Sequence, residues 1–395
     1  MRIAYICADQ GVPVFGCKGC SIHVQEVLAV LTRMGAQVDL FTPRPEGDRP
    51  SGRESLQIHE LRAVRGDCAA REQALLASNE DLRALLEREG PFDLVYERYS
   101  LWSFAGMEYA VTAQTPGILE VNAPLIEEQI QHRELIHRRE AERVAERVFR
   151  AATVLVAVSN EIGQYLRHCP GTHDRVHVVP NGVNPHRFRL RNAPARKDNE
   201  SFTVGFVGSL KRWHGLPVLV EAFALLHNSD PTARLLIVGD GPERVSLEDE
   251  LRSLGLRADA QLTGAVHPSE VPGLLAQMDV AVAPYPKLPG FYFSPLKVLE
   301  YMATGLAVAA SNIGQIEQLI QHEQTGLLFP PGNPVALGEA LARLRRDPEM
   351  RAQLGKNARS SVLREHTWEM VVTRILETAG CLSLLQTNVH KVGVS

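Results

Sequence analysis

The stretch FTVGFVGSLKRWHGLPVLVEAFALL, residues 202–226, predicts a strand, a glycine-bearing loop and a helix in direct succession. Residues 202–207 are mostly apolar, and residues 216–226 carry the apolar spacing of a helix. A strand that is apolar throughout suits a parallel sheet covered by helices on both faces. The same alternation continues along this half of the chain, with further strands predicted at residues 234–238, 280–284, 306–310 and 326–329.

The first half of the chain shows the same alternation of predicted strands and helices. Its helices are predicted at residues 22–34 and 72–89, and its strands at residues 2–7, 37–41, 92–96, 117–121, 153–158 and 176–179. A polar segment rich in Arg, Asn and Pro, residues 187–201, separates the two sets and is typical of a linker. We therefore predict an α/β fold with domains at 1–184 and 202–365, a linker at 185–201, a C-terminal helix at 366–381 and a tail at 382–395.

Length and composition narrow the class of protein. The 395 residues are too many for one ordinary core, and 45% hydrophobic with 22% charged residues is typical of a soluble globular protein. A net charge of -4 gives no reason to expect a nucleic-acid partner. Six cysteines in so long a chain do not suggest a disulfide scaffold, and the first apolar run is too short for a signal peptide. With no stretch long enough to span a bilayer, a cytoplasmic enzyme is expected.

The first predicted strand runs into a glycine loop, GVPVFGCKGCS at residues 11–21, which leads into a helix. A loop between a strand and a helix N-terminus binds anions, because free backbone N–H groups and the helix dipole face it. Gly16 and Gly19 are therefore candidate phosphate-binding residues, although a tight turn that only needs glycine explains them too. The spacing is not that of the dinucleotide-binding fingerprint.

The strongest block is FYFSPLKVLEYMATG, residues 291–305. Ser294 is a predicted N-cap and Pro295 suits the first helical position, so a helix is expected to begin here with free amides. A diphosphate at this end gains those donors and the dipole, and Lys297 in the first turn adds a positive charge. Glu300, about one turn later, is placed to accept hydrogen bonds from ribose hydroxyls.

A cationic loop, GSLKRWHG at residues 208–215, follows a predicted strand and also suits phosphate. Together with residues 291–305, VGDGP at 238–242 and VPNGV at 179–183, it resembles the family 4 glycosyltransferases, which are retaining enzymes of the GT-B fold. The resemblance covers nearly the whole chain. It implies two Rossmann-like domains facing a central cleft, with a UDP-sugar or GDP-sugar held mainly by the C-terminal domain. It also implies a small-molecule or glycan acceptor on the N-terminal domain, and a final helix, around Trp368, that crosses back onto it.

The resemblance assigns donor-binding roles residue by residue. Glu300 matches the second glutamate of the family's E-x7-E motif, which binds the donor ribose. The segment from Gly264 to Val266 matches the part that meets the nucleobase, and Gly16 to Gly19 matches the glycine loop beneath the phosphates. The remaining donor-binding positions are backbone or loop residues: Gly208, Phe293, Ser294, Pro295 and Leu296.

Four positions depart from the family pattern. Tyr292 stands where the motif has its first glutamate, so one expected sugar contact is missing or replaced. Ser209 and His214 stand where the family has an arginine and a lysine. Arg98 lies nearest to the place of a histidine that touches the sugar in many relatives, and is a catalytic candidate. The missing positive charge is expected from one or more of three cations: Lys211, Arg212 and Lys297.

Candidate acceptor-binding residues follow a strand of the first domain. Glu120 and Asn122 lie at the carboxyl end of the strand predicted at 117–121, facing the cleft; the alternative is that Asn122 caps the next helix. His23 is predicted either to orient a substrate, as a catalytic residue, or simply to pack. The charged helix predicted at 127–150 is a solvated face. Its Arg and His content leaves room for an anionic acceptor or a membrane surface, which nothing else in the sequence supports.

No metal or other cofactor is expected. Cys17 and Cys20 form a C-x-x-C but lack the second pair that a zinc site needs. The chain contains no Asp-x-Asp, the motif of metal-bridged diphosphate sites, so protein amides and cations must neutralise the leaving group. The resemblance implies attack by the acceptor on the face from which the diphosphate departs, with the diphosphate helping to take the acceptor's proton.

Three other functions stay open. A nucleotide-sugar 2-epimerase shares the architecture but acts on one substrate without an acceptor. A non-catalytic nucleotide-sugar-binding protein fits the replacements at Tyr292 and Ser209. A nicotinamide-dependent oxidoreductase is disfavoured by the missing fingerprint. Release of free nucleoside diphosphate only when an acceptor is present separates a transferase from the first two.

Overall fold

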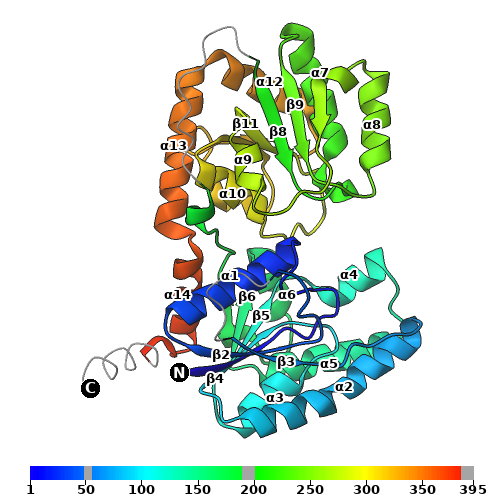
Figure 1. The fold of residues 1–395 in the computed structure, drawn as a ribbon, viewed down its shortest axis with the longest axis vertical. Helices are drawn as coiled ribbons and strands as arrows, with labels where there is room; N and C mark the ends of the chain where they lie inside the picture. The colour runs from blue at the N-terminus through cyan, green and yellow to red at the C-terminus, as the bar shows by residue number, and fades with distance from the viewer. Residues whose placement is uncertain (49–55, 189–200, 384–395) are drawn as a thin grey trace. The chain divides into compact units, whose positions relative to one another are not determined.

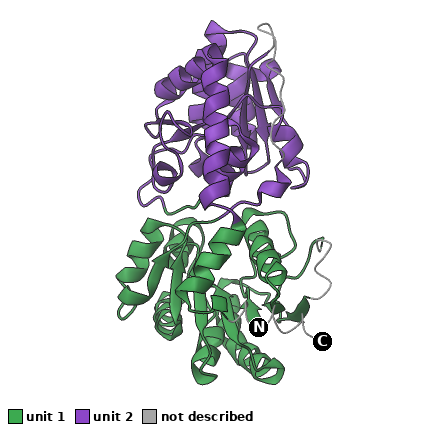
Figure 2. Cartoon of the chain, turned by 90° about the vertical axis from the view of Figure 1, so that its left-hand side faces the viewer, with its two compact units in different colours: residues 1–181, 292–294, 368–395 green, residues 182–291, 295–367 purple. Residues whose placement is uncertain are grey.

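The chain folds into two compact units, which are coloured separately in Figure 2. The computed structural model describes residues 1–48, 56–188 and 201–383. The first unit takes residues 1–181 and is joined by residues 292–294 and by the chain from residue 368 on, whereas the second takes residues 182–291 and 295–367. Most of the predicted linker, 185–201, and of the predicted tail, 382–395, falls outside the described residues.

The first unit is built on one parallel sheet in the order β3-β2-β1-β4-β5-β6-β7. The register places Ile3 of β1 between Val38 of β2 and Leu94 of β4. Its strands are β1 (Arg2–Ile6), β2 (Gln37–Thr42), β3 (Gln57–Glu60), β4 (Leu94–Arg98), β5 (Gly117–Val121), β6 (Val154–Ala157) and β7 (Val176–Val178).

Helices cover both faces of this sheet. Figure 1 shows α1 packed beside α14, while α3 packs against both α2 and α5. Buried side chains of the strands and helices, such as Phe41, Leu86 and Phe149, form its core. The helices are α1 (Gly19–Arg33), α2 (Cys68–Glu89), α3 (Ala105–Thr112), α4 (Leu125–His132), α5 (Arg138–Ala151), α6 (Asn160–Arg167) and α14 (Trp368–Thr378).

The second unit repeats the plan with a parallel sheet in the order β10-β9-β8-β11-β12-β13. Helix α7 packs against α8 and α12, and α10 packs against α9 and α13. The strands are β8 (Thr203–Val207), β9 (Arg234–Val238), β10 (Ala260–Leu262), β11 (Val280–Ala283), β12 (Ala307–Ser311) and β13 (Leu327–Phe329). The helices are α7 (Leu216–Ser229), α8 (Arg244–Ser253), α9 (Val271–Leu275), α10 (Leu296–Thr304), α11 (Ile316–Leu319), α12 (Pro334–Arg346) and α13 (Pro348–Glu365).

In both sheets the first strand of the unit, β1 or β8, lies in the interior, and the later strands lie on either side of it. This is the doubly wound topology of Rossmann-like sheets. The predicted α/β fold class is therefore confirmed. Each predicted strand is present within a residue or two at its ends, and the edge strands β3 and β10 were not predicted. Both carry polar residues that break the apolar pattern, such as Gln57 and Gln261.

One helix prediction is wrong. The charged pattern at 127–150 is not one helix but two, α4 and α5, with non-helical residues between His132 and Arg138. The break is stabilised by the carboxylate of Glu72, which accepts hydrogen bonds from the backbone N–H groups of Ile136 and His137 and so satisfies donors at the start of α5. In the described residues, no helix combines the length and the hydropathy needed to cross a membrane.

Candidate active site

In the second unit, the predicted donor loops follow neighbouring strands at the carboxyl edge of the sheet. Gly208 follows β8, Gly239 follows β9, and Gly264 lies two residues beyond β10. Gly208 and Gly239 adopt positive φ angles of 150° and 135°, which residues with a side chain rarely do, and a Cβ on Gly239 would also lie 2.0 Å from the carbonyl oxygen of Gly208. The loops therefore present bare backbone where ligands bind in open α/β sheets.

Lys297, in the first turn of α10, lies in an apolar surrounding beside Gly208. Its Nζ lies 4.2 Å from the ring centroid of Phe206 and 5.5 Å from that of Tyr285. The atom is buried, and none of the described residues forms a hydrogen bond with it. Burial lowers the pKa of Lys297 to about 7, against a smaller opposite effect of Glu300. A buried ammonium without a hydrogen-bond partner is ready to pair with an anion.

His214, Lys211 and Arg212, in the loop at residues 208–215, differ in the surroundings of their side chains. Burial, and then the nearby charges of Lys297 and Lys211, lowers the pKa of His214 to about 3, so this histidine is neutral and cannot supply the charge of the family's lysine. Its Nδ1 donates to the carbonyl oxygen of Ser209 at 2.5 Å. The Nζ of Lys211 lies 4.8 Å from the ring centroid of Trp213. Arg212 is 90% exposed and pairs with Glu243, so its side chain points into solvent.

The start of α10 differs from the prediction. The helix begins at Leu296 with Pro295 as its N-cap, so Ser294 is not the cap. Instead the Ser294 hydroxyl accepts a hydrogen bond from the backbone N–H of Asn181 at 3.1 Å, and its carbonyl oxygen accepts one from the Asn181 amide at 3.2 Å. The backbone N–H of Val298 donates to the carbonyl oxygen of Pro295 at 3.1 Å, and no side chain caps the two amides before it, those of Leu296 and Lys297, which leaves them as the candidate donors to a ligand.

The glycine loop of the first unit is held by a residue that the sequence analysis did not single out. The side-chain amide of Gln25, on α1, donates to the carbonyl oxygens of Val14 and Gly16, both at 2.9 Å. The backbone N–H of Gly16 also donates to Pro13, so the loop is a tight turn as well as a candidate phosphate-binding loop. Gly19 begins α1, and Lys18 provides no side-chain cap. A polar residue in the second turn of a helix after a glycine loop is the signal that points to Gln25.

His23 and Glu120 lie buried against each other. They are 1% and 2% exposed, and the Nε2 of His23 lies 2.7 Å from Glu120. Tyr96 donates to the other carboxylate oxygen at 2.8 Å, and Trp368 of α14 packs edge-on against His23. Both side chains therefore lie inside the unit, which agrees with the packing role that the sequence left open for His23, and the substrate-binding roles stay predictions. Although burial opposes ionisation, His23 and Arg98 hold the pKa of Glu120 below its ordinary value.

Arg98 and Asn122 lie at the carboxyl ends of β4 and β5. One guanidinium nitrogen of Arg98, Nη1, and the amide nitrogen of Asn122 are buried, and no hydrogen bond to either is found among the described residues. The suggestion that Asn122 caps the next helix is wrong, because the N-cap of α4 is Pro124. Arg98 stays a catalytic candidate, and Asn122 stays a candidate for binding the acceptor.

Cys17 and Cys20 are free thiols, the first exposed and the second partly buried. Across residues 1–48, 56–188 and 201–383, no group of three or more His, Cys, Asp or Glu side chains could hold a metal ion.

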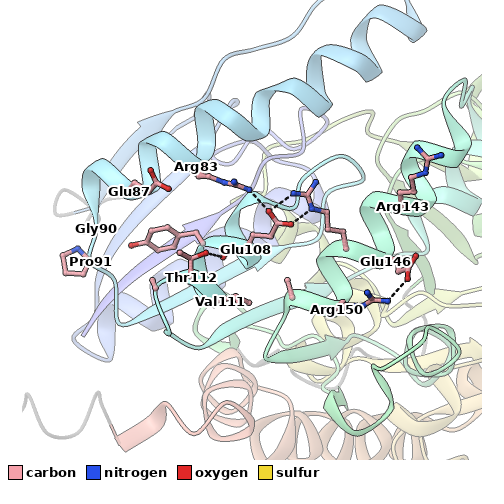
Figure 3. A pocket seen from close by; sticks show the side chains of 14 residues that line it. Arg83, Glu87, Gly90, Pro91, Glu108, Val111, Thr112, Arg143, Glu146 and Arg150 are labelled. Atoms are coloured by element: carbon pink, nitrogen blue, oxygen red, sulfur yellow. Dashed lines mark hydrogen bonds and ion pairs between the residues drawn. The ribbon is translucent and has the colours of Figure 1, made fainter.

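A hollow of about 1080 Å³ lies elsewhere on the first unit, between α2, α3 and α5 (Figure 3). Arg83 and Arg147 both pair with Glu108 there, and the Arg147 guanidinium lies 3.7 Å from the ring centroid of Phe104. Its lining residues Pro91 and Ala113 precede β4 and β5, so it lies at the amino edge of the sheet. None of the predicted site residues lines it.

The two doubly wound units, with glycine loops at the carboxyl ends of the strands of the second, form the GT-B fold. The family described as Glycosyltransferase Family 4 matches residues 18–187, and the family described as Glycosyl transferases group 1 matches residues 189–361. Together the two models cover both domains of a family 4 glycosyltransferase, and the chain belongs to that family. It is therefore a transferase enzyme, as the sequence predicted.

Relatives with an assigned function are distant in sequence but similar over most of their length. The chain is 27% identical over 365 residues to a D-inositol 3-phosphate glycosyltransferase of Pseudarthrobacter chlorophenolicus, covering 86% of this chain and 85% of the relative. It is 27% identical over 302 residues to the 2-deoxystreptamine glucosyltransferase of Streptomyces kanamyceticus, covering 70% and 74%.

Solved structures share the fold. Sucrose-phosphate synthase of Thermosynechococcus elongatus superposes with a TM-score of 0.75 at 21% identity over 100% of both chains. HepE of Anabaena in complex with UDP-glucose gives a TM-score of 0.70 at 18% identity, over 96% of this chain and 99% of HepE.

Proposed function

We propose that the protein transfers a sugar from a nucleoside-diphosphate sugar to a hydroxyl group of a small-molecule or glycan acceptor, with retention of configuration and without a metal ion. The observation that carries this proposal is the buried ammonium of Lys297 beside the bare backbone of Gly208. A buried cation costs free energy unless an anion pairs with it, and a diphosphate at the N-terminus of α10 supplies that anion.

The relatives indicate which substrates to test first. HepE was solved with UDP and with UDP-glucose, which supports a UDP-sugar as the donor. The two named relatives act on an inositol phosphate and on 2-deoxystreptamine, which supports a polyhydroxylated ring as the acceptor. GDP-sugars are the second donor class to test.

The proposed reaction breaks the bond between the anomeric carbon and the diphosphate and forms a bond to the acceptor oxygen on the same face. Negative charge grows on the departing diphosphate, and Lys297 and the first amides of α10 stabilise it. The acceptor's proton passes to an oxygen of the diphosphate, so no protein base is needed. Glu300, on α10, is proposed to accept hydrogen bonds from the ribose hydroxyls.

The experiment that tests the proposal is a nucleotide-release assay. Thermal shift with UDP-glucose, UDP-galactose and GDP-mannose selects the donor, because a ligand stabilises the folded state that binds it. Free nucleoside diphosphate is then expected only when myo-inositol phosphate, 2-deoxystreptamine or an oligosaccharide acceptor is added. A new nucleotide sugar formed without any acceptor would indicate an epimerase, and stabilisation without turnover under any condition would indicate a binding protein.

The cation assignment is tested separately by steady-state kinetics at saturating acceptor. We expect the loss of turnover to be largest in Lys297→Ala, smaller in Lys211→Ala and smallest in Arg212→Ala, because the Arg212 side chain is 90% exposed. Removing Lys297 should lower kcat more than it raises the donor KM, since the leaving-group charge develops along the reaction. Wild-type turnover in both lysine variants would mean that backbone amides alone hold the diphosphate.

A further inference from the structure

The hollow between α2, α3 and α5 follows from the lengths of these helices (Figure 3). The helix α3 has eight residues and packs against both α2, which has 22, and α5, which has 14. A short helix flanked by two longer ones leaves a groove, and α2 and α5 form its walls. Its volume of about 1080 Å³ is sufficient for a ligand the size of a nucleotide.

Positive side chains outnumber negative ones in this hollow. Its charged lining residues are four arginines and three glutamates: Arg83, Arg143, Arg147, Arg150, Glu87, Glu108 and Glu146. Arg83 and Arg147 share the carboxylate of Glu108. Arg83 donates to its Oε2 at 2.5 Å, and Arg147 donates to Oε2 at 2.9 Å and also to Oε1. Two positive charges therefore face one negative charge.

The arginines on the walls have further donors to offer. A guanidinium has five N–H donors, and the bonds to Glu108 use one of Arg83 and two of Arg147. The guanidinium of Arg147 also lies 3.7 Å from the ring centroid of Phe104, which helps to fix its plane. Arg143 is 75% exposed and lies 3.6 Å from Glu140, which is beyond hydrogen-bond length. The walls can therefore bind a further anion while they keep the contacts that they already make.

The rest of the lining is largely apolar, with Pro91, Tyr109 and Val111 among its residues. Val111 is 60% exposed, although it lies on a helix that is otherwise mostly buried. At Gly90 a Cβ would lie 2.4 Å from the Tyr109 hydroxyl, so the glycine allows the tyrosine to pack against the backbone there. An apolar lining between charged walls suits an anion that carries an organic body, rather than a bare ion.

We propose that this hollow binds a phosphorylated small molecule, at the amino edge of the first unit's sheet and separate from the loops at its carboxyl edge. The arginines bind the phosphate, because a planar guanidinium matches two phosphate oxygens at once, and the apolar lining contacts the body of the ligand. Glu108 orients Arg83 and Arg147 and competes with the ligand for them. All these residues belong to the first unit, so the inference does not depend on the proposed function.

Calorimetric titration with glucose 6-phosphate, AMP and inorganic phosphate tests the site, with saturating UDP present to occupy any nucleotide-sugar site. We expect glucose 6-phosphate or AMP to bind about tenfold more tightly than inorganic phosphate, and more weakly as NaCl is raised. Arg83→Gln and Arg143→Gln should each weaken that binding about fivefold. Arg88→Gln is the matched control and should bind like the wild type, because Arg88 is on α2 and 69% exposed but does not line the hollow.

Two further variants distinguish binding from a structural role of the ion pairs. Glu108→Gln should bind the organic phosphate several-fold more tightly, since it removes the anion that competes for Arg83 and Arg147. Val111→Asp should bind it more weakly at an unchanged melting temperature, because this exposed position tolerates the change and the new carboxylate repels the phosphate. Full affinity in both arginine variants would overturn the inference. So would a wild-type protein that binds neither organic phosphate, including one that binds only phosphatidylglycerol vesicles.

Discussion

Lys297 should take up a proton when the donor binds. Burial lowers the pKa of Lys297 to about 7 in the free protein, so at pH 8 only about one molecule in ten carries the charged form. A diphosphate next to Nζ stabilises the ammonium and raises its pKa again. Binding of UDP-glucose at pH 8 should therefore consume about 0.9 proton, and its dissociation constant should rise about tenfold from pH 6 to pH 8 and about tenfold more to pH 9.

Calorimetry at pH 8 in phosphate and in Tris measures this proton directly, because the two buffers differ in their heat of ionisation. UDP-glucose is the suitable ligand, since its diphosphate has no further ionisation between pH 6 and pH 9. Lys297→Arg is the control: arginine stays charged throughout, so this variant should bind without proton uptake and with a flat pH profile whatever its affinity. Equal apparent enthalpies in both buffers, together with a constant wild-type affinity from pH 6 to pH 8, would refute the reasoning.

Four further predictions follow from single groups. Glu300→Ala should lose a charge-assisted hydrogen bond of about 1.5–3 kcal/mol and bind UDP at least tenfold more weakly in calorimetry, and an unchanged dissociation constant would exclude the ribose role. Turnover should survive excess EDTA, and loss of turnover that manganese restores would contradict metal independence. Gln25→Met removes both hydrogen bonds to the glycine loop and should lower kcat/KM several-fold while the far-UV spectrum is kept; wild-type kinetics would show that the loop holds itself. Burial raises the pKa of Glu97 from 4.5 to about 7, so the folded state binds the extra proton and stability is lost as pH rises through that window. Glu97→Gln should therefore be more stable than the wild type by about 3 kcal/mol in urea at pH 8 and by little at pH 4.5, and an equal difference at both values would show that Glu97 does not titrate as described.

The strands of both sheets were predictable because each is a continuous apolar run between polar loops. The strands that were not predicted, β3 and β10, are edges whose polar residues face solvent, so the apolar pattern is absent there. The break between α4 and α5 was missed for a different reason. It depends on Glu72, which is distant in sequence and bonds to the backbone at residues 136 and 137.

The predicted site divides in the same way. Gly208, Lys297 and Glu300 could be predicted as site residues because glycine loops at strand ends and charged residues near the start of a helix are local features. Ser294 was assigned as a cap on the same local grounds, but its hydroxyl is taken by Asn181, 113 residues away in sequence. Local propensity names the residues that can cap a helix, and tertiary contacts decide which of them does.

By itself, the sequence determined that the chain forms two parallel α/β units, belongs to the family 4 glycosyltransferases, and carries bare loops and cations at the carboxyl ends of its strands. These properties depend on residues adjacent in sequence, where hydrophobic periodicity and backbone requirements act. Only the tertiary structure decided that His23 and Glu120 are buried against each other, that Lys297 is desolvated, and that Tyr292 bonds to Glu128 across 164 residues of sequence. Burial and pairing decide whether a side chain is charged and which groups it can contact. Both depend on neighbouring residues that the fold brings together and that are distant in sequence.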